Sequence, residues 1–348
     1  YRSRGLGDVY KRQLLMNIFK NLVLLFVVGL ICLVFLEFSM RLLKLHGDTD
    51  PTYIIESDEL PFQMKPNTTA KSIYGKEFSI NNHGLRGPNF VKDKSSDIYR
   101  IMVLGDSVAF GFCVDYEDTF SGILDSTLNQ TKNSVEIINA AHNGFNINDA
   151  YNYLKYYGLE FNPDLVILSV TASDNTDQSV TYMIKDGMGY SPGSRWIYVP
   201  SFVKKALRNS SLYMSIGLAK ARIEFIMSNR NQESITVQKE TMKPEVEKHL
   251  QDIARLSLEN SLPLLVVTIP SEHDVKRGFY EHDFFANISQ KRDEIKYDYI
   301  DTLSQFDPSK KNYCLNDGAH PSKYGHSTIA EMLYEEIISN IKSNSDIR

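Results

Sequence analysis

Two short segments of this 348-residue chain carry the residue types of an activated serine and its base. Gly105-Asp106-Ser107 follows a short apolar run, and Asp317 stands three residues before His320 near the other end of the chain. A serine hydroxyl is a poor nucleophile at neutral pH unless an imidazole takes its proton, and a carboxylate orients that imidazole through its other nitrogen. We therefore expect Ser107, His320 and Asp317 to serve as nucleophile, base and orienting acid.

Attack by a serine on an acyl carbonyl also needs hydrogen-bond donors for the oxyanion that forms. The sequence offers three of them: the backbone N–H of Ser107, the backbone N–H of Gly144 and the side-chain amide of Asn175. Glycine at position 144 lets the backbone approach a substrate without a Cβ in the way. The predicted chemistry is acyl transfer through a covalent serine intermediate.

A parallel sheet would bring these residues together. Short apolar runs typical of buried strands occur at 99–104, 135–141, 165–171, 264–269 and 297–303, and helical patterns at 120–129, 149–160, 244–260 and 322–341. Strands that alternate with helices predict an α/β fold with a parallel sheet covered on both faces. Ligands of such sheets bind at the carboxyl ends of the strands, which is where the candidate residues stand.

These motifs resemble those of the SGNH (GDSL-like) hydrolase family over residues 99–348. The resemblance implies a three-layer, doubly wound sheet of five parallel strands in flavodoxin-like order, and a serine esterase that needs no metal and no organic cofactor. Two positions depart from the family pattern. Val108 replaces the usual leucine, and the third block, Gly-x-Asn-Asp in the family, reads Ser173-Asp174-Asn175-Thr176 here. That block keeps its side-chain donor and loses the flanking glycine and aspartate.

An uncharged apolar segment at 21–36 predicts a membrane helix. Its sixteen residues would span about 24 Å against a hydrocarbon core of about 30 Å. Extension to residue 43 makes up the difference, with Arg41 and Lys44 reaching the interface and Glu37 placed near it. No small residue precedes a plausible cleavage point, so we favour an uncleaved anchor at 16–46 over a cleaved signal peptide or a buried core helix. Residues 1–15 are expected to be a non-native or disordered tail ahead of a start at Met16.

The charges on the two sides of this segment nearly balance, so they do not fix its orientation. The lead-in resembles that of membrane-anchored bacterial members of the family, which carry Gly84-Leu85-Arg86-Gly87 shortly before the serine block. That resemblance implies a single-pass protein of the cytoplasmic membrane with its catalytic domain outside, in the periplasm or at the cell surface. Residues 47–98 are expected to form a polar stalk or lead-in, and residues 176–243 an insertion or lid.

Three cysteines exclude a disulfide-dense scaffold. Cys113 stands six residues after Ser107 and Cys314 six before His320, so a disulfide is one expectation in an oxidising compartment and two free thiols are the other. The net charge of −5 argues against a nucleic-acid partner.

Other histidines were weighed as site residues. His142 would either touch substrate or satisfy a backbone group, and His326 is expected to be a surface or core residue of the last helix. Glu272-His273-Asp274 and Glu281-His282-Asp283 lack the spacing of zinc ligands and are expected in solvated loops, so no metal site is predicted.

The sequence thus predicts a membrane-anchored serine esterase that acts on acyl esters, acetyl esters included, of an envelope polysaccharide or lipid. The same triad would serve an O-acyltransferase that passes the acyl group to a glycan hydroxyl. A third alternative is a non-catalytic glycan-binding or assembly protein that keeps the fold.

Overall fold

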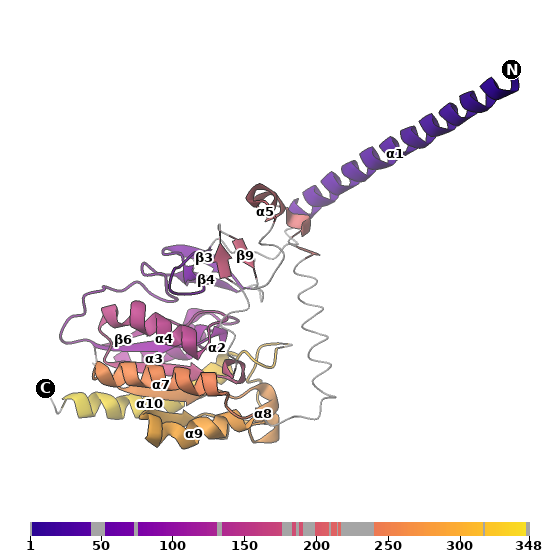
Figure 1. Cartoon of the computed structure of the whole chain (residues 1–348). Helices are drawn as coiled ribbons and strands as arrows, with labels where there is room; N and C mark the ends of the chain where they lie inside the picture. The colour runs from indigo at the N-terminus through magenta and orange to yellow at the C-terminus, as the bar shows by residue number, and fades with distance from the viewer. Residues whose placement is uncertain are drawn as a thin grey trace. The chain divides into compact units, whose positions relative to one another are not determined.

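The computed structural model describes residues 2–42, 53–72, 76–130, 134–175, 183–185, 188–190, 199–208, 210–213, 215–216, 240–315 and 317–345 (Figure 1). The chain divides into two units. One comprises residues 1–47 and 199–234, and the other comprises residues 48–198 and 235–348.

A five-stranded parallel sheet forms the centre of the larger unit. Its strands are β5 (Tyr99–Leu104), β6 (Val135–Asn139), β7 (Leu165–Val170), β10 (Leu264–Thr268) and β11 (Asp298–Asp301). They lie in the order β11-β10-β7-β5-β6, with every neighbouring pair parallel. This is the flavodoxin-like order, so the predicted fold class is confirmed. The middle strands β5, β7 and β10 are almost entirely buried, which is why they read as continuous apolar runs.

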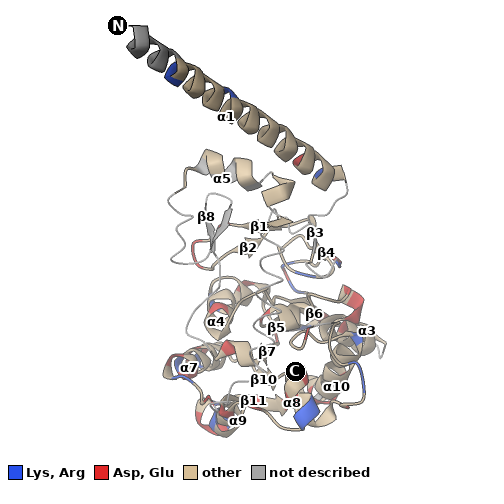
Figure 2. Cartoon of the chain, turned by 90° about the vertical axis from the view of Figure 1, so that its right-hand side faces the viewer, with Lys and Arg blue, Asp and Glu red and all other residues tan. Residues whose placement is uncertain are grey.

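Helices cover both faces of the sheet (Figure 2). One face carries α4 (Ile147–Tyr156), α7 (Pro244–Glu259) and α9 (Asp283–Ile295), and the other carries α3 (Phe120–Asn129) and α10 (Lys323–Ser345). Local signals fix where these helices begin. Thr119 caps α3 by accepting the N–H of Gly122, and Asn146 and Asp149 form a reciprocal capping box at α4. The four predicted helices are confirmed, with ends that differ by a few residues.

The first Glu-His-Asp triplet, at 272–274, is helical, which corrects its expected place in a loop, whereas Glu281 and His282 of the second lie in a bend before a helix. Glu272–Arg277 forms α8, where Ser271 and Asp274 make a capping box, and His282 stands at the N-cap position of α9. Among the described residues, no group of three or more His, Cys, Asp or Glu side chains is placed to hold a metal ion. The capping box at Ser271 is the local signal that the sequence analysis missed.

The described residues of the lead-in, 53–72 and 76–98, pack into the core of the larger unit. They contain two short antiparallel pairs, β1 (Ile54–Ile55) with β2 (Gln63–Met64) and β3 (Thr68–Lys71) with β4 (Glu77–Ile80). Phe62, Met64 and Leu85 are each at most 2% exposed and belong to the main hydrophobic cluster. The expected stalk or lead-in at 47–98 also includes residues 47–52 and 73–75, which lie outside the described part of the chain.

The expected lid at 176–243 lies mostly outside the described residues. Its described parts are an antiparallel pair, β8 (Met183–Lys185) with β9 (Met188–Tyr190), and a short helix, α5 (Ser201–Arg208). Residues 199–234 belong to the same unit as the N-terminal helix. The insertion is therefore divided between the two units.

A single long helix, α1 (Arg2–Leu42), forms most of the described part of the smaller unit. Its segment Tyr10–Leu42 is the one helix among the described residues that is long and apolar enough to cross a membrane. Residues 2–15, expected to be a tail, continue this helix because no proline interrupts them.

Candidate active site

Ser107 stands at the first position of α2 (Ser107–Phe110), directly after strand β5. Asp106 caps this helix, with its Oδ1 accepting the N–H of Val108 at 2.8 Å. Gly105 has φ of +150°, and a Cβ there would lie 3.0 Å from the Cβ of Ser169 and 3.1 Å from that of Ala109. The strand-to-helix turn that presents the serine therefore requires glycine at this position.

The two distant segments meet as the sequence predicted. Ser107 Oγ lies 2.7 Å from His320 Nε2, and His320 Nδ1 lies 2.7 Å from Asp317 Oδ2. Asp317 Oδ1 accepts the backbone N–H groups of Ala319 at 2.8 Å and His320 at 3.0 Å. The serine, the imidazole and the acid thus form one hydrogen-bonded chain, which allows proton transfer from the hydroxyl to the ring.

The contacts of Asp317 favour its ionised form, which can accept a hydrogen bond from Nδ1 of His320. Burial raises the pKa of Asp317, but the hydrogen bonds from His320 and from the backbone N–H of Ala319 outweigh it, and the pKa lies below its usual value. The carboxylate is ionised at neutral pH, so it fixes the tautomer that carries the proton on Nδ1 of His320. Nε2 is then free to accept the serine proton.

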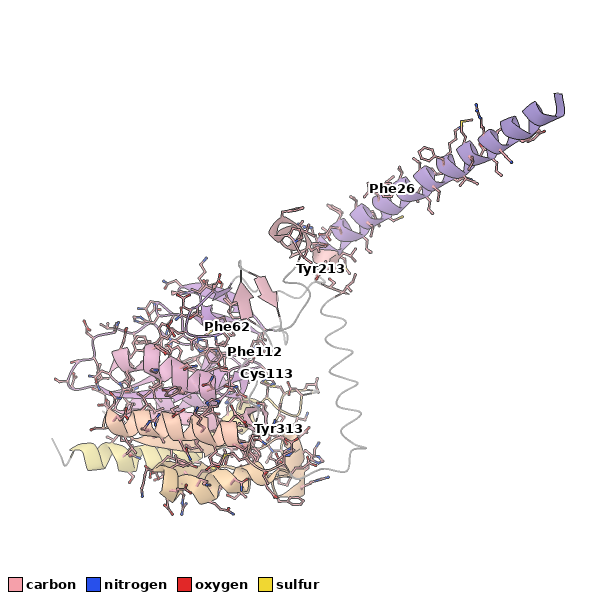
Figure 3. The ribbon with its side chains drawn as sticks, viewed as in Figure 1. Phe26, Phe62, Phe112, Cys113, Tyr213 and Tyr313 are labelled. Carbon is pink, nitrogen blue, oxygen red and sulfur yellow. A yellow bond between two sulfur atoms is a disulfide. The ribbon has the colours of Figure 1, made fainter. Side chains whose placement is uncertain are left out.

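A disulfide links the segment after Ser107 to the loop that carries Asp317 and His320. Cys113, three residues after α2, is bonded to Cys314 with a Cα–Cα distance of 6.6 Å (Figure 3). The backbone N–H of Cys314 donates to the carbonyl of His320 at 2.9 Å. The bond therefore connects the segment that follows the nucleophile to the loop that carries the base.

Arg86 holds the same segment from the lead-in. Its guanidinium is 2% exposed and donates from Nη1 to the carbonyls of Phe110 (2.8 Å) and Gly111 (2.6 Å), and from Nη2 to that of Val114 (2.6 Å). It also lies 4.8 Å from the centre of the Phe110 ring. In the sequence, the motif around Arg86 is only a likeness to the family. Its contacts show that it fixes the chain just after the nucleophile.

The predicted oxyanion donors stand at the carboxyl ends of three adjacent strands, β7, β5 and β6. Gly144 is exposed and has φ of +80°, a conformation that favours glycine. Asn175 is 6% exposed, and its amide spans the start of α7: Nδ2 donates to the Thr241 carbonyl and Oδ1 accepts the Lys243 N–H, both at 3.0 Å. Nδ2 carries two hydrogens, and the bond to Thr241 uses one of them.

The unusual third block contacts the serine block. Oδ2 of Asp106 accepts the hydroxyl of Thr171 at 3.0 Å and that of Ser173 at 3.1 Å. Ser173 occupies the position where the family pattern has glycine, so this departure adds a donor to the carboxylate that caps α2. Asp174 is buried, and burial together with the charge of Asp106 raises its pKa.

The other two histidines near these segments are structural. His142 is 1% exposed, with Nδ1 2.9 Å from the Ala140 carbonyl and its ring stacked on Phe145, and burial lowers its pKa to about 4. The structure thus gives His142 the second of its two expected roles. His326 is fully buried and accepts the N–H of Phe120 on Nδ1, and burial lowers its pKa to about 3. Neither ring has the basicity of a general base near neutral pH.

Several solved structures are similar to this chain. A psychrotrophic esterase from Pseudoalteromonas sp. is 14% identical with a TM-score of 0.42, and the match covers 71% of this chain and 99% of that one. A putative lipolytic protein of the G-D-S-L family from Desulfitobacterium hafniense is 14% identical with a TM-score of 0.40, covering 68% and 98%. An acetyl xylan esterase is 16% identical with a TM-score of 0.42, covering 68% and 99%.

These structures include proteins of the family that the sequence motifs resemble. No family model and no protein of curated function matches the sequence. The function is therefore inferred from the geometry of the site.

Proposed function

We propose that this protein is a serine ester hydrolase of the SGNH type, anchored by α1 in the cytoplasmic membrane with its catalytic unit outside. The observation that carries the proposal is the continuous hydrogen-bonded chain from Ser107 through His320 to Asp317, with 2.7 Å at each side-chain contact. A serine placed at a helix start and paired with an imidazole of fixed tautomer is the arrangement that activates a hydroxyl for attack.

The reaction follows from these contacts. Ser107 Oγ attacks the ester carbonyl as its proton passes to His320 Nε2, and the N–H groups of Ser107, Gly144 and Asn175 stabilise the oxyanion. The protonated imidazole then donates to the leaving alcohol, which departs and leaves an acyl-serine. Water attacks the acyl-serine as one of its protons passes to His320 Nε2. The imidazole then returns this proton to Ser107 Oγ as the bond between Oγ and the acyl carbon breaks, and the acid product is released. Every step uses side chains and backbone groups of the site.

The substrate class follows from the proposed location. A disulfide beside the site suits an oxidising compartment outside the cytoplasm. The esters accessible there are acyl groups, acetyl groups included, on envelope polysaccharides and lipids. We therefore propose acylated glycan or lipid as the substrate.

Hydrolysis of p-nitrophenyl acetate and labelling by a fluorophosphonate probe test the activity. We expect the parent to hydrolyse the ester and to be labelled, and Ser107→Ala to lose both. Ser304→Ala, which removes an exposed serine hydroxyl, is the matched control and should retain both. Equal hydrolysis by the parent and Ser107→Ala would overturn the proposal, and a parent that is neither active nor labelled would favour a non-catalytic binding protein.

The same acyl-serine could react with a glycan hydroxyl in place of water. Product analysis with a glycan acceptor present distinguishes the two reactions. We expect free acid as the product, whereas acylated glycan would identify an O-acyltransferase.

A further inference from the structure

Glu37 is a carboxylate five residues before the end of α1, directly after the uncharged apolar stretch of that helix, and its two oxygens accept four hydrogen bonds. Oε1 accepts Nε of Arg41 at 2.7 Å and the N–H of Ser211 at 2.8 Å. Oε2 accepts the hydroxyl of Ser210 at 2.8 Å and the N–H of Leu212 at 2.9 Å. A charged side chain near the apolar part of a membrane is costly unless it is paired, and three of these four donors come from a segment 173–175 positions away.

The partner segment begins a helical turn at Ser211. Glu37 accepts the N–H groups of Ser211 and Leu212, which have no partner within the turn itself. Ser210 completes the cap, because its Oγ also accepts the N–H of Tyr213 at 3.2 Å. Both segments belong to the same structural unit. This part of the insertion is therefore bound to the candidate anchor helix.

The residues on either side of the contact with Glu37, which belong to the same unit as α1, include exposed apolar side chains and basic residues. Phe202 is 75% exposed, Ile216 60% and Tyr213 40%. Residues 199–216 contain two lysines and one arginine and no acidic residue. Exposed aromatic and aliphatic side chains next to basic residues are typical of segments that lie in the headgroup region of an anionic bilayer, and tyrosine favours that interface.

We propose that residues 199–216 form an interfacial foot: a segment that Glu37 holds against the end of α1 and whose apolar side chains enter the boundary between lipid headgroups and acyl chains. The partner is a bilayer containing anionic lipid. This inference rests on the proposed anchoring by α1. It assigns this part of the insertion to membrane attachment and not to a lid over the sheet.

Quenching of tryptophan fluorescence by lipids with brominated acyl chains tests the foot in the full chain. The chain has one tryptophan, so Trp196→Phe gives a background into which single tryptophans are placed. Phe202→Trp and Ile216→Trp report the foot, and Phe26→Trp, 71% exposed on α1, reports the anchor. Val91→Trp, 72% exposed in the larger unit, is the control outside the membrane.

In nanodiscs with anionic lipid, we expect tryptophan fluorescence at positions 202 and 216 to be quenched almost as strongly as at position 26. Tryptophan fluorescence at position 91 should be unchanged. The foot would be overturned, with the anchor left intact, by one result. In that result tryptophan at position 26 is quenched, and tryptophan at 202 and 216 is quenched no more than tryptophan at 91. No quenching at 26 would overturn the anchor and the foot together. Hydrolysis of p-nitrophenyl acetate by the same variants reports the proposed activity independently.

Glu37→Gln tests the docking contact itself. The amide keeps the shape of the side chain but removes the charge and one acceptor oxygen. Combined with Ile216→Trp, it should reduce the quenching at 216 towards the value at 91, and combined with Phe26→Trp it should leave the quenching at 26 unchanged. Undiminished quenching at 216 would overturn the role of Glu37.

Discussion

The disulfide between Cys113 and Cys314 should contribute strongly to the stability of the larger unit. The bond joins positions 201 residues apart, and both sides of it carry residues of the triad. In the chain-entropy treatment a closed loop of about 200 residues gives an upper value of about 5 kcal/mol at 25 °C. Removal of a native disulfide commonly costs about 2–5 kcal/mol. We expect a loss in this range from the double variant Cys113→Ala, Cys314→Ala.

Urea unfolding and ester hydrolysis measure the effect. The free energy of unfolding should fall by about 2–5 kcal/mol, and kcat should fall more than KM rises, because the loop that carries His320 loses its tie to the nucleophile. Reductant should lower the free energy of unfolding and the kcat of the parent in the same way, and should change neither quantity in the double variant. Cys32→Ala, which alters the free cysteine on α1, is the matched control and should change neither quantity.

Unfolding of the double variant and of the Cys32 control at the same urea concentration would contradict a stabilising role of the disulfide. The same role would equally be contradicted if the double variant lost activity in reductant as the parent does, because the reductant would then act elsewhere.

Four further substitutions test single contacts. Asp317→Asn should lower kcat by about 10⁴-fold through the wrong imidazole tautomer, and p-nitrophenyl acetate hydrolysis at near-parental rate would contradict this. Asn175→Ala should lower kcat by about 10²–10³-fold, the loss of one oxyanion donor, whereas reduced stability at unchanged kcat would show only a bracing role. Arg86→Lys should lower the free energy of unfolding by about 1–3 kcal/mol for each carbonyl left unpaired, as measured by urea unfolding. An unchanged unfolding midpoint would show that the guanidinium contacts of Arg86 are dispensable. Because burial lowers the pKa of His142 to about 4, the unfolded chain binds more protons than the native state between pH 4 and 6.5. The stability of the parent relative to His142→Gln should therefore fall by about 2 kcal/mol from pH 7 to pH 5, and an equal difference at both pH values would show that His142 does not titrate as inferred.

The triad could be predicted from the sequence because each of its parts has a local signal. Gly105 to Ser107 follows an apolar run that ends a buried strand, and Asp317 and His320 share one turn. A parallel sheet collects the carboxyl ends of its strands at one edge, so correct strands were enough to bring Ser107 and His320 together. The short helix α8 was not predicted, because its six residues carry only a capping box at Ser271 and no long hydrophobic period.

The contacts that surround the triad, and those that hold residues 210–212 to α1, were decided by the tertiary structure alone. Arg86 reaches the carbonyl of Val114, Ser173 reaches Asp106 across 67 positions, and Glu37 meets its partners across more than 170. Hydrophobic periodicity records which side of an element is buried, but not which distant polar group lies opposite it. The sequence by itself therefore determined the order of strands and helices along the chain and identified the serine, histidine and aspartate that form one hydrogen-bonded chain. The partners of Arg86 and Glu37 depended on how the packed chain brings distant polar groups within hydrogen-bond reach, because a buried polar group must find a donor or acceptor wherever the fold provides one.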